Sequence, residues 1–432
     1  MDSIVSNLLK DVPVPKMFRV KQIFSGENIA PEHIPEEVIA RLNEKDLEKK
    51  IRPGMRVAIT AGSRGIDNIS LILKTLVHFV KEHGGEPFLV AAMGSHGGAT
   101  SEGQREILRG LGITEEFMGC PIRSSMEVVK IGTNAEGGDV LLSRDAAEAD
   151  GIIVCNRIKP HTCFRGPSES GLIKMMVIGL GKQIGADHCH KEGFQNMAKN
   201  LRLFGKTMIE KAPILFGLGI LENSFDQTAK FVAFRREEIY DGEPACLEEA
   251  RKLLPCIYPP ECDVLVCDTI GKNFSGSGMD ANISGTFVTP YASGGLKSQR
   301  VAVLDLSSES HHNGTGCGMA HATTRRFFEK MQFELTYPNV ITSTVIENVR
   351  IPMVLKNDRE AIQVCLKTCT GLGGKSPRMI RISNTTEVEH ILLSEQYFEM
   401  AQSHPCLAVE TEPYHMPFDE DGNLKDLGHI GM

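Results

Sequence analysis

Short apolar runs alternate with amphipathic stretches through the first part of the chain. Residues 55–60, 86–93 and 151–157 are runs of mostly aliphatic side chains, with the length and composition of buried strands. Residues 68–83 instead place their apolar side chains at helical spacing and end at a pair of glycines. Strands that alternate with helices in this way predict a parallel or mixed sheet with helices on its faces.

The same alternation starts again after residues 255–260, which contain three prolines and are typical of a linker. Residues 263–268 form an apolar run that resembles residues 150–155. Beyond it the pattern predicts further strands and helices, namely strands 301–306, 353–355 and 379–382 and helices 320–331 and 358–369. A second α/β unit is therefore expected.

These patterns predict two α/β domains and a tail. We expect an N-terminal domain over residues 1–260, a C-terminal domain over residues 261–405, and a tail over residues 406–432 that packs back on the surface. With 432 residues the chain is too long for one ordinary core. The simplest location for an active site is the cleft between the two domains.

Composition narrows the class of partner. The chain is 41% hydrophobic and 24% charged, with a net charge of −8 and no basic patch that could displace counterions from phosphates. We therefore expect a small-molecule partner and no nucleic acid. The 12 cysteines are scattered singly and the chain begins without an apolar leader, which favours a cytoplasmic location. The sequence contains no run of about 18 apolar residues, so we expect no membrane span.

Polar side chains follow three of the predicted strands at the point where each strand ends. Arg64 comes after the first strand, His96 after the second, and Lys159 and His161 after the third. Because ligands of α/β sheets bind beyond the carboxyl ends of the strands, we expect these side chains at one rim. Taken singly, a loop arginine is as often a solvated charge, and a loop histidine is often bonded to backbone.

The segment after His161 holds further reactive side chains. Lys174 lies in the apolar run 172–178, where no solvent-facing stripe accounts for it. A desolvated lysine has a lowered pKa and an available amine, which suits covalent attachment; the alternative is a lysine that extends its ammonium to solvent. His188 and His190 are two residues apart, so on a helix at most one of them faces a common site.

Other polar residues near helix ends are interpreted as structural. Ser101 and Gln104 fit a capping box at the start of a helix. Charges at helix termini are the simplest interpretation of three more residues, Asp67, Glu102 and Lys182.

Four motifs fit one known pattern. They are Gly94-Ser-His96-Gly, His161 followed by Phe-x-Gly, Ser170-Gly171-x-x-Lys174, and a histidine 16 residues after this lysine, at His190. Together they resemble the nickel-pincer nucleotide-dependent lactate racemase family. The resemblance covers roughly residues 19–200 and, more weakly, the C-terminal domain.

The resemblance implies a cofactor in the N-terminal domain. This cofactor would be a pyridinium mononucleotide with sulfur groups, joined through a thioamide to Lys174. Nickel would be bound by one carbon and two sulfurs of the nucleotide, with His190 as its protein ligand. Ser170 and Gly171 belong to the matching motif, and Ser63 stands near a helix N-terminus that could receive the cofactor phosphate.

The resemblance also implies racemisation of a 2-hydroxy acid. Removal of the Cα hydrogen as hydride leaves a planar 2-keto acid, and return of the hydride to the other face inverts the centre. A base must take the hydroxyl proton of each enantiomer, and His96 and His161 match the two bases of the family. Arg64 matches the active-site arginine, which would orient the substrate carboxylate or keto oxygen.

This chain departs from the lactate racemase pattern. The loop between His161 and Ser170 is longer and contains Arg165, which becomes a candidate substrate contact. Leu172 stands where the pattern prefers a glycine. In the C-terminal domain, Lys272 is the candidate substrate lysine, with an ordinary surface lysine as the alternative. These differences favour a substrate larger than lactate, such as a sugar acid.

The sequence therefore predicts an isomerase, a nickel-pincer-dependent racemase or epimerase of a 2-hydroxy acid. Two alternatives stay open: an oxidoreductase or lyase with the same cofactor, and a non-enzymatic protein that binds nickel or a nucleotide. A histidine base for each face of the substrate favours the isomerase, because a carrier has no use for two bases. The oligomeric state is open, and a homo-oligomer is compatible with the sequence.

Overall fold

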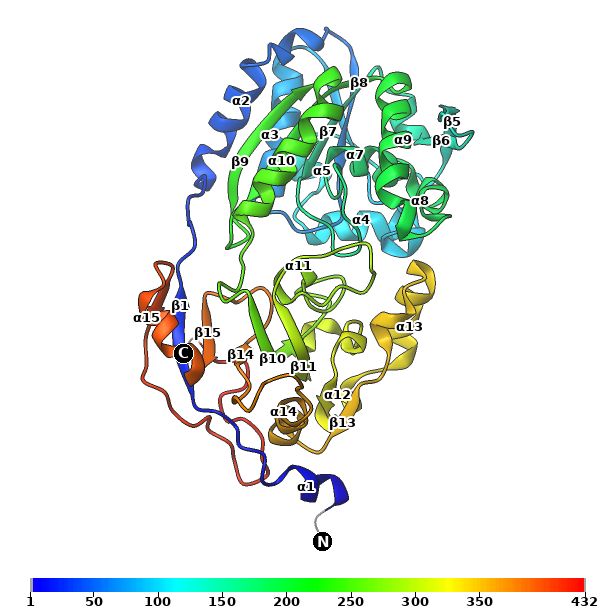
Figure 1. The fold of residues 1–432 in the computed structure, drawn as a ribbon. Helices are drawn as coiled ribbons and strands as arrows, with labels where there is room; N and C mark the ends of the chain where they lie inside the picture. Colours follow the sequence, from blue (N-terminus) through cyan, green and yellow to red (C-terminus); the bar gives the residue numbers. More distant parts are fainter. Residues whose placement is uncertain (1–2, 431–432) are drawn as a thin grey trace. The chain divides into compact units, whose positions relative to one another are not determined.

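The computed structural model describes residues 3–430 and falls into two units, each built on its own sheet (Figure 1). Unit 2 comprises Ser25–Leu254, and unit 1 comprises the described residues up to Phe24 together with those from Pro255 onward. Both units are α/β, as the alternating pattern predicts. Within residues 3–430, no helix combines the length and the apolar character that crossing a membrane requires.

Unit 2 has a six-stranded sheet of order β4-β3-β2-β7-β8-β9. Its strands are β2 (Arg56–Ala61), β3 (Glu86–Ala91), β4 (Ile122–Arg123), β7 (Gly151–Arg157), β8 (Ile214–Glu222) and β9 (Thr228–Arg235). All neighbours in this sheet pair in parallel except β8 and β9. The carboxyl ends of β2, β3, β7 and β8 therefore meet at one edge, and the three strands expected from the first apolar runs are confirmed.

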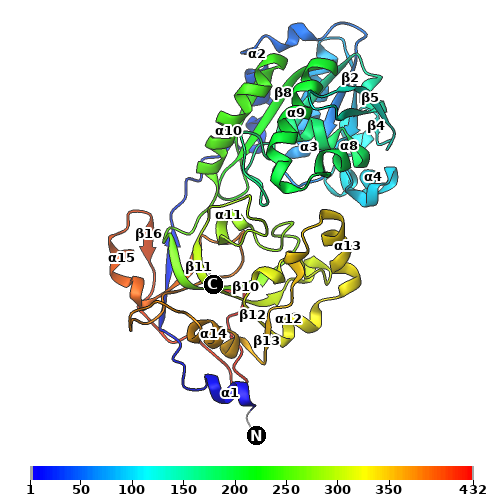
Figure 2. The ribbon, with the colours of Figure 1, turned by 45° about the vertical axis from the view of Figure 1, so that its right-hand side comes forward.

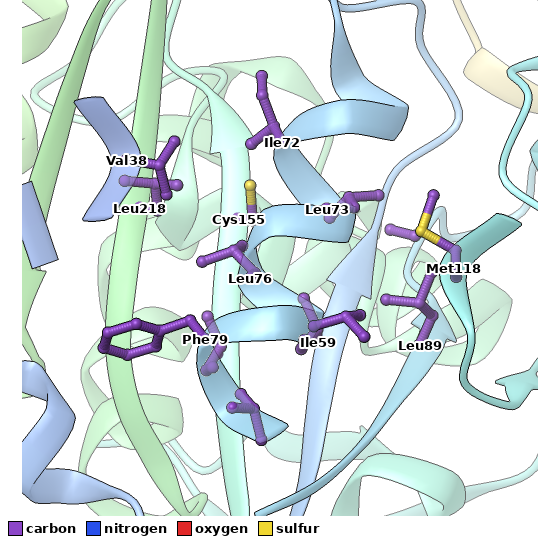
Figure 3. Close-up of a cluster of buried hydrophobic side chains, with 14 of the residues drawn as sticks. Val38, Ile59, Ile72, Leu73, Leu76, Phe79, Leu89, Met118, Cys155 and Leu218 are labelled. Carbon is purple, nitrogen blue, oxygen red and sulfur yellow. The ribbon is translucent and has the colours of Figure 1, made fainter. Parts of the chain in front are cut away.

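Helices cover both faces of this sheet, as Figure 2 shows for α3, α9 and α10. Side chains alternate between the faces along β2, so that Ile59 joins one core cluster and Ala58 the other. On the first face, side chains of α3 lie over β2, β3, β7 and β8 (Figure 3). Each fully buried leucine or phenylalanine there stabilises the fold by about 1.5–3 kcal/mol. The strands whose ends carry the candidate site residues are therefore packed in a stable core.

The remaining elements of unit 2 connect these strands. They are α2 (Ile34–Asn43), α3 (Ile69–Glu82), α4 (Ser101–Gly110), α5 (Glu115–Met118), the hairpin β5 (Val128–Thr133) and β6 (Asp139–Ser143), α6 (Arg144–Ala147), α7 (Leu172–Lys174), the π-helical turn η4 (Met175–Gly179), α8 (Lys182–His190), α9 (Met197–Lys211) and α10 (Ile239–Leu253).

The start of α4 differs from the expected capping box. The N-cap is Thr100, whose side chain accepts a hydrogen bond from the Gly103 N–H at 3.0 Å. Gln104 does not cap the helix, because its side chain is fully buried and bonds elsewhere. The S-x-x-Q pattern therefore marks the helix start one residue late.

Unit 1 has an eight-stranded sheet of order β13-β12-β11-β10-β14-β15-β1-β16. Its strands are β1 (Met17–Gln22), β10 (Glu261–Ile270), β11 (Lys297–Leu306), β12 (Ala322–Thr324), β13 (Met353–Leu355), β14 (Met379–Ile382), β15 (His390–Ser394) and β16 (Leu407–Val409). Its helices are α1 (Ile4–Leu9), α11 (Ala281–Ser284), α12 (Arg325–Lys330), α13 (Phe333–Ser343), α14 (Asp358–Lys367) and α15 (Phe398–Ser403). The first five strands in the sheet order are parallel, and the last three are antiparallel.

Two features of unit 1 differ from the expected elements. Residues 3–24 belong to this unit and not to the N-terminal domain, because β1 pairs with both β15 and β16. The expected helix 320–331 is interrupted, because Ala322–Thr324 forms β12 and α12 starts only at Arg325. The Thr324 hydroxyl caps α12 by accepting from the Phe327 N–H at 3.1 Å.

The C-terminal tail is part of the core of unit 1 and does not simply lie on its surface. Met416 and Leu424 are each only 6% exposed. Arg381 is fully buried, and its guanidinium binds both carboxylate oxygens of Asp268 at 2.8 Å and Asp426 Oδ1 at 3.1 Å. This network joins the tail to β10 and β14, so the tail and the sheet stabilise each other.

Candidate active site

Four predicted site residues follow the strands whose carboxyl ends share one edge of the unit 2 sheet. Ser63 and Arg64 follow β2, His96 follows β3, and His161 follows β7. β2 lies between β3 and β7, so these loops come from neighbouring strands. The strand-end positions expected for these residues are therefore present in the fold.

Ser63 and His96 are joined directly, because the Ser63 hydroxyl makes a short hydrogen bond with His96 Nδ1. The imidazole of His96 is exposed. When Nδ1 carries the ring hydrogen and donates it to Ser63, Nε2 keeps its lone pair and is able to take up a proton. The bond thus orients the His96 ring through a residue that the sequence had associated with the cofactor phosphate.

Arg64 is exposed to solvent. Partial desolvation, followed by the positive charge of Arg157, lowers the pKa of Arg64. Arg157 itself forms an ion pair with Glu222 at the end of β8. An arginine that starts from so high a pKa stays charged at physiological pH, so Arg64 presents an available cation for an anionic ligand.

The loop that carries His161 is closed at its base by backbone hydrogen bonds. Lys159 N–H donates to Ser170 O at 2.9 Å, and Ser170 N–H donates to Lys159 O at 3.2 Å. The residues between form the longer loop noted in the sequence. Its closure holds His161 next to α7, although an unsupported loop of this length would be mobile.

Glu169 organises the inside of this loop, and its side chain is fully buried. Its carboxylate accepts the N–H of His161 at 2.6 Å and the N–H of Gly166 at 2.9 Å. It also pairs with Arg251 of α10 at 2.6 Å. The backbone of His161 is thus fixed by a buried charge, which the sequence analysis missed.

Replacing Glu169 by glutamine should destabilise unit 2 by about 1–3 kcal/mol, because an amide has one acceptor oxygen and leaves buried donors unsatisfied. Urea unfolding measures the difference. The matched control is Glu248→Gln, which removes an exposed carboxylate from the same Arg251 and should change stability by less than about 0.5 kcal/mol. Equal effects of the two variants would show that Glu169 does not hold the loop.

Arg165 binds within the same loop. Its Nη1 donates to the carbonyl oxygen of His161 and lies 3.3 Å from Glu169 Oε2. The side chain is 23% exposed. These contacts give Arg165 a part in holding the loop, and its contact with substrate remains a prediction.

The His161 ring lies in an apolar and positively charged environment. Its centroid is 4.6 Å from that of Phe164. Burial, and then the positive charges of Lys174 and His190, hold the pKa of His161 well below its usual range, so the ring is neutral near pH 7. Nδ1 accepts the Cys163 N–H at 3.1 Å, which places the ring hydrogen on Nε2. Action of His161 as a base at Nε2 requires the other tautomer.

Lys174 ends a short helix that a buried carboxylate caps. Glu243 Oε2 accepts the Ile173 N–H at 3.0 Å, and Asn156 Nδ2 donates to Gly171 O at 3.0 Å. A Cβ at Gly171 would lie 2.5 Å from Glu243 Oε2, so a larger residue there would displace the carboxylate that caps the helix. The Ser170-Gly171 motif thus has a structural reason, namely the close approach of Glu243.

The amine of Lys174 is poorly solvated. Burial lowers the pKa of Lys174 to about 8, and the positive charge of Arg64 acts in the same direction. The lysine leads directly into the π-helical turn Met175–Gly179, a rare conformation that is frequent at functional sites. A lysine with this pKa has a far larger fraction of free amine near pH 7 than an ordinary one.

His190 closes the group at the end of α8. Its Nδ1 bonds to the Ala186 carbonyl at 2.7 Å, so Nδ1 carries the hydrogen and Nε2 keeps a lone pair. Burial lowers the pKa of His190. His188 is exposed on another side of the helix, as their spacing predicts. The rings of His190 and His161 lie on the same Phe194, with centroids 5.9 and 6.2 Å away.

His161, Lys174 and His190 are therefore brought together in unit 2, with Arg64 near enough to act on the pKa of the lysine. Lys272 lies in unit 1, in the loop after β10, where its ammonium donates to Gly276 O at 2.9 Å. Its contact with substrate and the expected cleft between domains stay predictions.

The family model of the lactate racemase N-terminal domain matches residues 9–201. That segment is therefore similar to the lactate racemase N-terminal domain. The match includes Arg64, His96, His161, Lys174 and His190, so the grouped side chains all lie inside the recognised domain.

The solved structures similar to this chain include the lactate racemase apoprotein from Thermoanaerobacterium thermosaccharolyticum. The TM-score is 0.51 with 13% sequence identity, over 86% of this chain and 99% of that chain. At this identity the likeness establishes a shared fold. A comparison with curated protein sequences finds no match to this chain.

Two residues that the sequence did not point to, Glu243 and Arg251, contact the candidate site from outside the segment that the family model matches. Glu243 and Arg251 stand on α10, beyond the matched segment. Glu243 accepts a hydrogen bond from α7, which carries Lys174, and Arg251 pairs with Glu169, which fixes the backbone of His161. The signal available in the sequence was an acidic residue on the apolar face of a helical pattern, since Glu243 lies at helical spacing from Ile239 and Leu247.

Proposed function

We propose that this protein is an isomerase that inverts the stereocentre of a 2-hydroxy acid, with a nickel-pincer nucleotide attached to Lys174. The observation that carries the proposal is the pairing of two unusual side chains. Lys174 has a poorly solvated amine, and His190 is held by Ala186 in the tautomer that a metal ligand requires. Both lie in the matched lactate racemase N-terminal domain.

The protein donors fit such a group. Within residues 3–430, no cluster of three or more His, Cys, Asp or Glu side chains could hold a metal by itself. His190 would then be joined by ligands from a bound organic group, and soft carbon and sulfur donors suit nickel. Such a group, when bound, supplies an acceptor for the Cα hydrogen of the substrate together with its two electrons.

The residues of the chain would then handle the substrate and its proton. His96 and His161 take the hydroxyl proton of opposite enantiomers as the hydroxyl carbon is oxidised to a keto group, and return it on reduction. Arg64 orients the carboxylate by charge-assisted hydrogen bonds. The longer loop around Glu169 departs from the lactate racemase pattern next to His161, which favours a substrate larger than lactate, such as a sugar acid.

The decisive experiment uses pure enantiomers of 2-hydroxy acids in deuterated buffer, with protein co-produced with the enzymes that make the cofactor. We expect the enantiomers to interconvert with the Cα hydrogen retained, because hydride returns to the carbon that it left. Chiral chromatography and mass spectrometry measure both quantities. Protein made without those enzymes is the control and should be inactive.

Three outcomes would contradict the proposal. Deuterium at Cα would indicate exchange with solvent and a proton-transfer mechanism. Net accumulation of a keto acid or of a dehydrated product would indicate an oxidoreductase or lyase. Full activity without the cofactor-making enzymes would remove the nucleotide from the mechanism.

A further inference from the structure

Lys182, the first residue of α8, combines two unfavourable features. Its side chain is fully buried, and its backbone has a φ of +55°, in the left-handed region that lysine rarely adopts. Burial lowers the pKa of Lys182 to about 8, and the negative charge of Asp145 opposes this. An ordinary helix-terminus charge would lie in solvent, so that interpretation of Lys182 is wrong.

The ammonium of Lys182 donates hydrogen bonds to two residues that are distant along the chain. It donates to the carbonyl oxygen of Ala91, the last residue of β3, at 2.6 Å. It also donates to Gln104 Oε1 at 3.1 Å. Both acceptors are buried, so this lysine has exchanged water for two protein oxygens.

Gln104 continues the chain of hydrogen bonds to the loop of His96. Its side chain is fully buried, and its Nε2 donates to Gly94 O at 2.9 Å and to His96 O at 3.3 Å. The amide thus uses its oxygen for Lys182 and its two N–H groups for the loop. A continuous buried network leads from α8 to the backbone of His96.

The turn before Lys182 packs against the same loop. Gly94 N–H donates to Gly179 O at 3.3 Å, and a Cβ at Gly179 would lie 2.7 Å from Ala92 O. The segment from Lys174 to His190 and the loop of His96 are therefore in backbone contact at one point. Lys182 and Gln104 add a second, polar connection between them.

We propose that Lys182 and Gln104 form a positioning pair, which fixes the backbone of His96 relative to the segment that carries Lys174 and His190. Its catalytic consequence rests on the function proposed above, because it assumes that His96 accepts the substrate proton. A strained lysine without a bonded carboxylate is a poor choice for stability alone. The same lysine is well suited to hold β3 and α4, which carry its two acceptor oxygens, in one arrangement with α8.

The first test needs no cofactor. Lys182→Met keeps the volume of the side chain and removes its donors, so amide hydrogen exchange in residues 92–100 should become at least about tenfold faster. Mass spectrometry of peptic fragments measures the rates. The matched control is Lys230→Met, which removes an exposed lysine paired with Glu249 on the same unit and should leave these residues unchanged.

The second test uses loaded enzyme. We expect Lys182→Met to lose about 10- to 100-fold in kcat, with KM nearly unchanged and with the adduct mass and nickel content of the parent protein. This split separates displacement of a base from loss of the cofactor or general unfolding. Unchanged exchange in residues 92–100 in folded Lys182→Met would overturn the proposal whatever the activity.

Gln104→Glu is the variant to use if Lys182→Met does not fold. A carboxylate keeps the contact with Lys182 but cannot donate to the carbonyl oxygens of Gly94 and His96. Faster exchange limited to residues 92–100 would support the proposal, and parental exchange there would contradict it. If the parent protein shows no isomerase activity, the exchange result still decides the positioning role, so the two proposals fail separately.

Discussion

Lys174→Met should leave the protein without a covalent adduct and without measurable isomerase activity. Methionine fills the same apolar run but has no amine to form the thioamide. Intact-mass analysis of protein co-produced with the cofactor-making enzymes measures the adduct. Lys199→Met, which removes an exposed lysine of α9, is the control and should carry the full adduct. An adduct on Lys174→Met would contradict the attachment site.

The same lysine has a pH dependence that can be measured on unloaded protein. With a pKa of about 8, roughly a tenth of the Lys174 amine is neutral at pH 7. Its labelling by an amine-reactive reagent should therefore rise with a midpoint near pH 8. Exposed lysines should show midpoints above about 10. A midpoint for Lys174 in that higher range would show that its amine is not desolvated.

His96→Gln and His161→Gln should each lower kcat by about 10²–10⁴-fold while the adduct on Lys174 stays intact. Glutamine is a hydrogen-bonding side chain of similar length but cannot accept the proton. His188→Gln is the matched control, because His188 is exposed on α8. Parental activity in either site variant would remove that histidine from the mechanism.

A single turnover separates the two histidines. If each accepts the proton of one enantiomer, each variant should form keto acid from one pure enantiomer and not from the other, with opposite preferences. Acid quenching and quantification of the keto acid measure this at equimolar enzyme and substrate. If neither variant forms keto acid from either enantiomer, the two histidines act together.

Local patterns were sufficient for the part of the site at the strand ends. The runs that became β2, β3 and β7 are continuous and aliphatic, so their ends could be located without knowledge of the rest of the fold. Arg64, His96 and His161 follow these ends directly. Lys174 could be recognised as well, since an amine inside an apolar run is visible in the sequence.

The supports of the site could not be predicted, because their partners are distant along the chain. Glu169 binds Arg251, and Lys182 binds Ala91, so neither contact leaves a local pattern. The role of Gln104 was misassigned, because its spacing from Ser101 matches that of a capping box. β12 was missed for a related reason, because three residues paired with β11 and β13 carry too little periodicity to interrupt a helical pattern.

The place of β1 in the sheet has a consequence for the order in which the protein is made. Ser25–Leu254 is continuous, so unit 2 is able to fold once that stretch has left the ribosome. Met17–Gln22 is translated before unit 2 but pairs with β15 and β16, which are translated after it. β1 must therefore stay unpaired while unit 2 is made, and a nascent chain stopped before β15 would keep it as an open edge.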